Sequence, residues 1–227
     1  MNLFSETQSP QLPFYLPNNI NYSYKYDEKS KSFFITIPNG ELIYFEFFFN
    51  KNISDKIILY FKKNNTINWQ SQKIKIYGKE VIQPRLTSWY GDTGVTYSYS
   101  GITLYPNKWN KKLLYIKKQI EKITDKTFNS VLLNWYRDGE DYMNWHADDE
   151  KELGTNPVIA SISFGKTRDF VLRQNNDSSQ KITIPLTHGS LLIMQGEIQH
   201  HWKHCLPKRK RVKGSRFNLT FRDVVDV

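Results

Sequence analysis

The sequence contains a single cysteine, Cys205, among 227 residues. One cysteine excludes an internal disulfide framework and a zinc site built from several cysteines. The chain also has no apolar run of the roughly 18 to 20 residues that cross a bilayer. Its first residues lack the basic start and apolar stretch of a secretory leader. We therefore expect a protein of a reducing, intracellular compartment, nucleus or cytoplasm, without membrane contact.

Acidic residues are scarcer than basic ones. The chain has 22 Asp and Glu against 32 Lys and Arg, a formal net charge of +10. Its 39% hydrophobic and 15% aromatic content is that of a folded domain rather than of a disordered tail. Basic globular proteins often bind nucleic acid, although net charge alone does not specify a chemistry.

The N-terminal part is expected to hold a tail, two strands and a helix. Three prolines without apolar periodicity predict a loose tail over residues 1–20. Two runs rich in aromatic and β-branched residues, SFFITI and ELIYFEFFF, flank the turn sequence Pro38-Asn39-Gly40. Apolar residues at helical spacing then predict a helix near 53–64, with Asn52 or Ser54 as its N-cap.

The middle of the chain mixes strand, loop and helix signals. Residues 73–77 alternate polar and apolar side chains and then meet Gly78, which predicts a solvated strand that ends in a turn. Residues 85–101 contain three glycines and look too irregular for one element. Pro106 is expected to open an amphipathic helix whose apolar face starts at Trp109 and continues at steps of three and four residues.

From residue 128 onward, short strand-like runs dominate. Six of them follow one another with turn residues between most: VLLNWY, IASISF, DFVLR, KITIPL, SLLIM and FNLTF. Strands of this length and spacing predict an all-β sandwich or barrel. Because no repeat or linker divides the chain, we expect one domain over 21–227. Residues 21–127 would form an N-terminal extension, a substrate-recognition region and supporting helices, and 128–227 the catalytic core.

The five histidines include one metal-binding pattern. His146-Ala147-Asp148 is an H-x-D, and His204 follows beyond the SLLIM run. Two imidazoles and one carboxylate that leave coordination positions open form the facial triad of non-haem Fe(II) oxygenases. By itself an H-x-D is weak, because one arises by chance in roughly one chain in four of this composition.

The last strand-like run adds a second signal. With a period of two, its polar side chains share one face and its apolar side chains share the other. Two arginines that face the interior of a sandwich are costly unless they bind anions, which a dicarboxylate would supply. An exposed basic edge strand is the alternative. In the earlier VLLNWY run, Asn134 and Tyr136 share a face and could bind the same acid. The polar face of the last run comprises Arg216, Asn218, Thr220 and Arg222.

Five ordered segments resemble the AlkB family of Fe(II)/2-oxoglutarate-dependent nucleic-acid dealkylases, and look most similar to the eukaryotic AlkB homologues that repair methylated DNA. The segments are NSVLLNWYRDGEDYMNWHADDE, SISFGKTRDF, HGSLLIMQGE, HHWKHCLP and SRFNLTFR, and the earlier PRLTSWYGD fits the same family. The resemblance covers residues 74–222. It implies a mainly β fold with flanking helices (α+β), a double-stranded β-helix of the jelly-roll type with N-terminal helices and a nucleotide-recognition hairpin region.

The resemblance also assigns residues. His146, Asp148 and His204 match the iron ligands, with no catalytic residue beyond them. His204 is preferred to His200 and His201 because the family ligand lies two residues before the Leu-Pro pair, and His188 is expected to be structural. The 2-oxoglutarate anchors match Asn134, Tyr136, Arg216, Thr220 and Arg222.

The implied activity is oxidative demethylation of 1-methyladenine and 3-methylcytosine in DNA, with RNA as a further substrate. The reaction would use Fe(II), 2-oxoglutarate and O2 and release formaldehyde, succinate and CO2. A monomer is expected. Since the target atom is unreachable inside a duplex, the base must be flipped out. The residues that match the substrate-binding positions are Tyr77 and Gly78 at a hairpin tip, Tyr90 and Asp92 in WYGD, and Asp149 and Glu150 after the ligand carboxylate.

Other interpretations of these residues stay open. Tyr77 fits a plain strand-end tyrosine as well as a wedge that fills the gap left by a flipped base. Tyr90 fits core packing, and Asp149 and Glu150 fit a solvated acidic turn. The basic segment from Lys203 to Arg216 fits phosphate contact, a nuclear localisation signal (KRKR) or a solvated loop. Two other functions also remain open: a 2-oxoglutarate oxygenase that acts on RNA modification, protein or a small molecule, and a catalytically inactive nucleic-acid-binding module.

Overall fold

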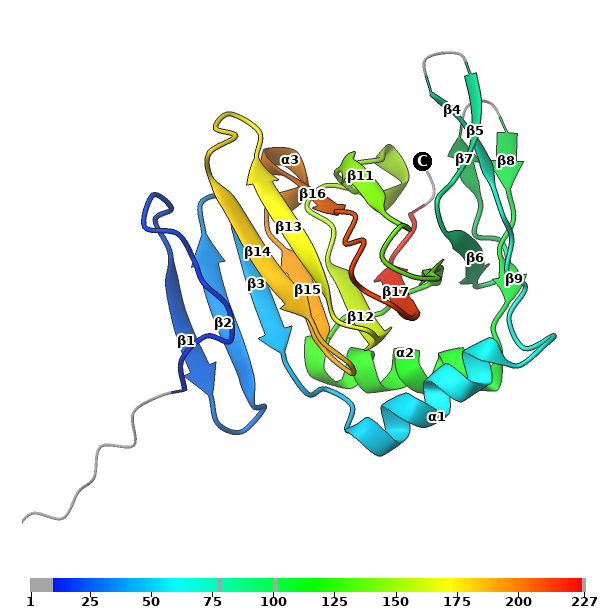
Figure 1. Ribbon diagram of the computed structural model, residues 1–227, viewed down its shortest axis with the longest axis horizontal. Coiled ribbons are helices and arrows are strands. Elements are labelled where there is room, and N and C mark those ends of the chain that lie inside the picture. Colours follow the sequence, from blue (N-terminus) through cyan, green and yellow to red (C-terminus); the bar gives the residue numbers. More distant parts are fainter. Residues whose placement is uncertain (1–9, 77–78, 100–101, 226–227) are drawn as a thin grey trace, which may run out of the picture.

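Two β-sheets that face each other form the centre of the protein (Figure 1). The computed structural model describes residues 10–76, 79–99 and 102–225. The larger sheet has nine strands in the order β1-β2-β3-β15-β12-β17-β10-β6-β9. Their bounds in that order are Ser23–Asp27, Ser32–Ile37, Gly40–Phe45, Leu191–Gln195, Ile159–Gly165, Arg216–Arg222, Ser130–Tyr136, Leu86–Gly91 and Asn107–Lys108.

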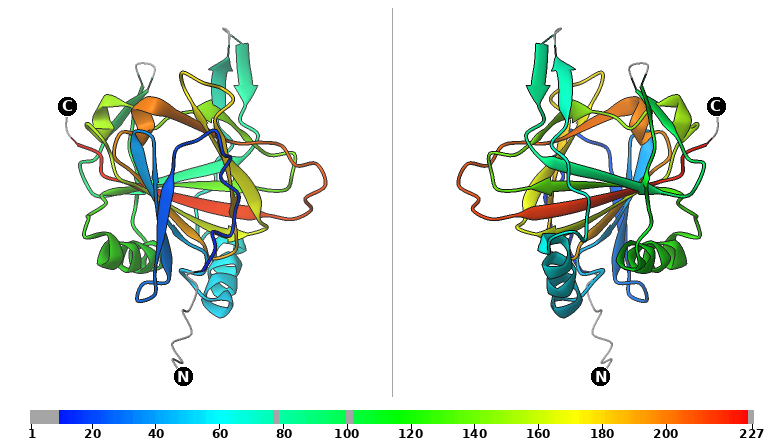
Figure 2. Two further views of the ribbon diagram at one scale, coloured as in Figure 1. Left: turned by 90° about the vertical axis from the view of Figure 1, so that its left-hand side faces the viewer. Right: turned by 90° about the vertical axis from the view of Figure 1, so that its right-hand side faces the viewer.

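The smaller sheet has four antiparallel strands in the order β11-β16-β13-β14. These are Met143–His146, Trp202–Leu206, Arg168–Gln174 and Lys181–Leu186. Two hairpins project from the end of the molecule opposite the longer helices (Figures 1 and 2). They are β4–β5 (Lys73–Ile76, Lys79–Ile82) and β7–β8 (Tyr97–Tyr99, Ile102–Leu104).

Two apolar cores lie on opposite faces of the nine-stranded sheet. On one face, helices α1 (Lys51–Lys62) and α2 (Lys111–Thr124) bury Phe61 and Ile116 against Phe217 of β17. On the other face, Leu192 packs with Ile184 of the smaller sheet. The helices therefore close one side, and the space between the two sheets is left for a site.

The fold class is confirmed, because the structure is mostly β-sheet with few helices and has two facing sheets, as in a jelly roll. All six strand-like runs after residue 128 form strands, namely β10, β12, β13, β14, β15 and β17. Two strands in this region, β11 and β16, were not predicted. Both are short, and each contains a histidine in place of a regular apolar alternation. The four-residue helix α3 (Ile198–His201) was also missed.

Residues 85–101 were expected to be too irregular for one element, and they contain two strands, β6 and β7, separated by a turn. β6 is an inner strand that pairs with β10 along six residues and with β9 in parallel. Its sequence, LTSWYG, ends in the glycine that made the segment look irregular. Gly91 fits closely there: a Cβ would lie 3.1 Å from the Asn129 carbonyl oxygen and from a carbon of Pro106, so a larger residue would require these neighbours to shift.

Both helix starts differ from the prediction. α1 begins at Lys51, and Asn50 is its N-cap, with the side-chain oxygen 3.0 Å from the Ile53 amide nitrogen. α2 begins at Lys111 and not at Pro106, because β9 intervenes and the Asn110 side chain caps the helix. In each case the side chain of an asparagine accepts a hydrogen bond from a backbone amide two or three residues ahead and sets the start of the helix, which is the usual N-cap geometry.

The N-terminal segment is not loose where the structure describes it. Leu16 and Ile20 are 3% exposed and belong to the core between the sheets, with Phe33 of β2 as a neighbour in that core. The first nine residues lie outside the described part of the chain. The strand predicted over ELIYFEFFF ends at Phe45, after which a turn leads to α1. Among the described residues, no helix is long and apolar enough to cross a membrane.

Candidate metal centre and active site

A cavity opens between the two sheets, at the polar face of β17. Its lining comes from strands β10, β11, β12, β13, β15, β16 and β17 and from the segment just after β11. The face predicted for the last strand is the one that lines the cavity, with Arg216, Asn218, Thr220 and Arg222 all exposed to it. The alternate side chains of β17 lie in the core against the helices.

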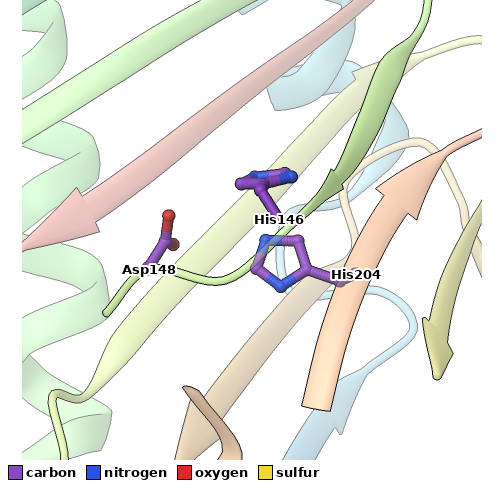
Figure 3. A group of neighbouring side chains, drawn as sticks. All are labelled: His146, Asp148 and His204. Carbon is purple, nitrogen blue, oxygen red and sulfur yellow. The ribbon is translucent and has the colours of Figure 1, made fainter. Parts of the chain in front are cut away.

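Three potential metal ligands converge at this cavity (Figure 3). One ligand atom each from His146, Asp148 and His204 lies within 4.8 Å of the other two. His146 ends β11 and pairs across the sheet with His204 of β16, which places the two ring centroids 4.2 Å apart. Asp148 follows two residues after His146, where β11 has ended. The predicted H-x-D…H set is thus brought together.

The free polar atoms of the three residues fit a bound cation. Oδ2 of Asp148 and Nδ1 of His204 are buried without a hydrogen-bond partner. Nδ1 of His146 lies 2.8 Å from the Asn144 carbonyl oxygen. Donation to that carbonyl fixes the tautomer and leaves Nε2 as a lone-pair donor, which is the usual arrangement of a metal-binding histidine. Buried acceptors without partners are costly unless a ligand satisfies them.

The electrostatics keep the ligands in their metal-binding protonation states. Burial lowers the pKa of His204 to about 3, and the neighbouring His146 contributes in the same direction. Burial also lowers the pKa of His146. Burial opposes ionisation of Asp148, but the Arg222 guanidinium and the two imidazoles outweigh it and hold its pKa at about 2. At neutral pH the site is therefore a carboxylate with two neutral imidazoles, the form that binds metal.

The two arginines of β17, buried Arg216 and partly buried Arg222, have different partners. Arg216 donates from Nη2 to the Ser163 hydroxyl at 2.9 Å, and its guanidinium carbon lies 5.2 Å from the centroid of the Tyr136 ring. Burial lowers its pKa to about 10. Arg222 instead forms an ion pair with Asp148, with Nη2 and Oδ1 2.8 Å apart. It therefore orients a metal ligand. The sequence had predicted only that Arg222 binds 2-oxoglutarate, and this second role was not predicted.

Both arginines retain capacity for an anion. Nε of each is buried without a hydrogen-bond partner. Thr220 donates to Asn218 at 3.2 Å, and Asn218 donates to the Ser161 hydroxyl at 2.8 Å, so these neutral groups form a network beside the arginines. A dicarboxylate such as 2-oxoglutarate has the charge and the acceptor atoms that this set needs.

Two site residues were missed. Arg85 is 6% exposed and donates from Nε to the Asn134 side-chain oxygen at 2.8 Å, so it holds one of the predicted anchors. Its position within PRLTSWYGD was the available signal. Asn218 was placed on the correct face of its strand but given no role, although it lines the cavity together with Leu132.

Tyr90 was predicted to contact the target base, and the structure contradicts this. It pairs with Val131 of β10, whose side chain lies in the core against the helices, and Tyr90 lies in the same core. Its hydroxyl accepts a hydrogen bond from the Asn68 backbone amide at 3.1 Å. Because side chains alternate along a strand, Trp89, which pairs with Leu132, lies on the face of the sheet that borders the cavity, and Tyr90 lies on the opposite face.

Asp92 is also not placed as predicted. It accepts a hydrogen bond from the Trp109 indole nitrogen at 2.6 Å and ties the end of β6 to the start of α2. Asp149 is exposed and Glu150 is half-buried next to Asp148, and the Glu150 carbonyl accepts from the Leu153 amide in a 3₁₀ turn, η1 (Lys151–Leu153). Tyr77 and Gly78 lie outside the described residues.

The other histidines do not join the centre. His188 accepts from the Gly165 amide at 3.0 Å and its Nε2 lies 3.1 Å from Asp55, which confirms a structural role. His201 pairs with Glu197, with Nε2 and Oε2 3.4 Å apart, and His200 is exposed. The choice of His204 over these two agrees with the geometry.

The basic segment before β17 is partly neutralised. Arg209 pairs with Asp169, with Nη2 and Oδ2 2.6 Å apart, and Lys208 lies 3.7 Å from Glu140. Backbone hydrogen bonds at 2.8 and 2.9 Å join Arg209 and Val212 to Gly139 and hold the loop against the 138–141 turn. The exposed cations that follow are Lys210, Arg211 and Lys213.

A fold of two facing sheets, with two imidazoles, one carboxylate and two arginines in one cavity, is that of an iron and 2-oxoglutarate oxygenase. The model of the 2OG-Fe(II) oxygenase superfamily matches residues 41–222, and the chain belongs to this superfamily. Fe(II), 2-oxoglutarate and O2 are its cofactor and cosubstrates.

Within the superfamily, the relatives are AlkB homologues. The chain is 49% identical over 151 residues to "Alpha-ketoglutarate-dependent dioxygenase alkB homolog 3" of Mus musculus, a match that covers 63% of this chain and 52% of that protein. It is 38% identical over 212 residues to "DNA oxidative demethylase ALKBH2" of Arabidopsis thaliana, covering 82% and 67%. The chain thus spans about half of the mouse relative's length.

A solved structure described as "The structure of OsALKBH1" shares the fold. Its TM-score is 0.57 at 16% sequence identity, and the match covers 80% of this chain and 96% of that one. At this identity the likeness concerns the fold alone. The assignment of the site therefore rests on the residues of the cavity and on the family match.

Proposed function

We propose that the protein removes methyl groups oxidatively from alkylated bases of DNA, 1-methyladenine and 3-methylcytosine being the expected lesions. The single observation that supports this best is the cavity in which His146, Asp148 and His204 leave free ligand atoms beside the two arginines of β17. Two relatives named for dioxygenase and DNA demethylase activity support the substrate class.

Bound Fe(II) would supply the oxidising chemistry by activating O2 with 2-oxoglutarate. Overall, one N-methyl group, 2-oxoglutarate and O2 are converted into the unmethylated base, formaldehyde, succinate and CO2. The chain's own groups do three things. His146, Asp148 and His204 would hold the metal, Arg216 would pair with a carboxylate of 2-oxoglutarate, and Arg222 fixes the ligand carboxylate.

The positive charge of the methylated bases suits the acidic segment after the ligand. Asp149 and Glu150 adjoin Asp148 on the chain, and one of them is exposed. We propose that these carboxylates accept hydrogen bonds from the exocyclic amine of the flipped base. Tyr77 and Gly78 lie between β4 and β5 in the sequence, and Tyr77 is the candidate for the wedge that would replace that base in a duplex.

The remaining parts of the proposal concern the whole chain. We propose that residues 21–227 work as one catalytic domain and as a monomer, in the nucleus or the cytoplasm. The nine-stranded sheet supports a single domain, because β3 from the N-terminal part pairs directly with β15 of the later part, and β2 and β1 extend the sheet from β3. RNA is a second substrate to be compared with DNA.

The test is turnover of a methylated oligonucleotide. The protein with Fe(II), 2-oxoglutarate and O2 should release formaldehyde and succinate in equal amounts from oligonucleotides that carry 1-methyladenine or 3-methylcytosine. Single-stranded DNA, duplex DNA and RNA of one sequence are compared. His146→Ala should abolish release of both products, since it removes one of three metal ligands.

Other results would redirect the assignment. Succinate without formaldehyde would mean that 2-oxoglutarate is consumed and the substrate is another molecule. Binding of oligonucleotide without either product would mean a catalytically inactive nucleic-acid-binding module.

A further inference from the structure

We propose that Gln199 is a positioning residue for the metal ligand Asp148. The inference rests on the metal centre proposed above and concerns how this chain holds one of its ligands. The Gln199 side-chain oxygen accepts a hydrogen bond from the Asp148 backbone amide at 2.9 Å, across 51 residues of sequence. Neither sequence motif nor strand periodicity indicated this contact.

Asp148 needs such a contact because no sheet ladder holds its backbone. β11 ends at His146, and the chain has no regular structure again until the 3₁₀ turn that begins at Lys151. Asp148 is nevertheless 4% exposed. A buried backbone N–H that lacks a ladder partner requires another acceptor. Gln199 supplies that acceptor.

Gln199 is itself well fixed. It is 2% exposed, lies on α3 between β15 and β16, and its amide nitrogen is 3.9 Å from the Met194 sulfur. The segment is anchored next to it by the Trp202 indole, which donates to the Pro38 carbonyl at 2.8 Å. Because β16 carries His204, the Gln199 hydrogen bond joins the backbone segments of two metal ligands.

The carboxylate of Asp148 is then held from two sides. Arg222 binds Oδ1 at 2.8 Å, Gln199 binds the backbone amide at 2.9 Å, and Oδ2 remains as the buried atom without a partner. Without Gln199, only the ion pair would orient the carboxylate, while the unpaired amide would favour a shift of the segment toward water. Partners that orient metal ligands typically contribute 10- to 100-fold to metal affinity.

The test measures metal affinity separately from activity. Gln199→Met keeps a side chain of similar length and removes the acceptor, and we expect it to weaken Co(II) and Mn(II) binding by about tenfold. Gln199→Glu keeps an oxygen acceptor and should stay within about threefold of the parent. Gln195→Met is the matched control, because Gln195 bonds the exposed carboxylate of Glu41 and does not touch the cavity.

Controls for folding separate a loss of the hydrogen bond from a loss of structure. Circular dichroism and thermal melting without metal show whether each variant is folded, and Gln199→Asn, which draws the amide back by one methylene, replaces the Met variant if that one does not fold. Unchanged metal affinity in a folded Gln199→Met protein would overturn the inference. Equal losses in Gln199→Met and Gln199→Glu would also overturn it. Absence of metal binding by the parent protein would instead overturn the metal centre itself.

Discussion

At the scale of single residues, the metal centre consists of ionisable side chains. Burying any one of them without a partner would cost free energy. His204 is held neutral by its surroundings, and Asp148 is held ionised by Arg222. The sequence pointed to these residues through an H-x-D pattern and a family resemblance, and the structure brings the three side chains together. The sequence assigned Arg222 to the cosubstrate alone, since a contact 74 residues away along the chain has no local signal.

His204 makes the stability of the metal-free protein depend on pH. Its pKa is about 3 in the folded protein against an ordinary value of 6.5, so between these pH values the unfolded chain binds a proton that the folded protein does not. The contribution is fully present above pH 6.5 and is lost as the pH falls toward 3. Between pH 7 and 5 we expect a loss of about 2 kcal/mol in the free energy of unfolding.

Urea unfolding at several pH values, without metal, measures this loss. His204→Asn should flatten the curve in that window, although the remaining contribution of His146, whose pKa is also lowered, should persist. His200→Asn, at an exposed position on α3 outside the cavity, is the control and should leave the curve unchanged. A His204→Asn protein with the parent's pH dependence would contradict the argument.

At the scale of elements, asparagine caps and strand pairing determined boundaries that apolar periodicity had placed wrongly. Asn50 and Asn110 set the starts of α1 and α2. The N-terminal segment shows the largest difference, because three prolines suggested a loose tail whereas Leu16 and Ile20 are buried between the sheets. Prolines prevent helix and ladder formation, but they do not prevent an irregular segment from packing.

Leu16 should therefore contribute to stability as a core residue does. Leu16→Ala is expected to lower the free energy of unfolding by about 2 to 3 kcal/mol, since it removes buried methyl groups and leaves a cavity. Tyr15→Ala, at a neighbouring position that is 70% exposed, should change it by less than about 0.5 kcal/mol. Equal, small effects in thermal or urea unfolding would mean that this segment does not pack in solution.

At the scale of the whole molecule, the net charge of +10 is not spread evenly over one binding surface. Arg216 and Arg222 are inside the cavity, and Lys208 and Arg209 have acidic neighbours. Among the described residues, the exposed cations of the loop before β17 that have no acidic partner are those at 210, 211 and 213. Phosphate contact, if the substrate is nucleic acid, should depend on these more than on the formal total.

Salt dependence of oligonucleotide binding tests this. Each phosphate contact contributes about 0.7 to 0.9 to the slope of log affinity against log salt. The triple variant Lys210→Gln, Arg211→Gln, Lys213→Gln should therefore reduce the slope by about 2 to 3.

A second triple variant, Lys118→Gln, Lys122→Gln, Lys126→Gln, is the control. It removes the same charge from exposed positions on and beside α2, the helix on the far side of the larger sheet. Equal slopes for the two variants would mean that only net charge matters.

The sequence by itself determined the jelly-roll class and the polar face of β17, and it pointed to the three side chains that the structure brings together. Each of these depends on patterns of a few residues or on a family match over most of the chain. The tertiary structure decided which face of each strand became the cavity, so Trp89 and not Tyr90 lies on that side of β6. It also joined Arg222 and Gln199 to Asp148. Side-chain alternation is local, but contacts across 51 to 74 residues exist only once the two sheets have packed together.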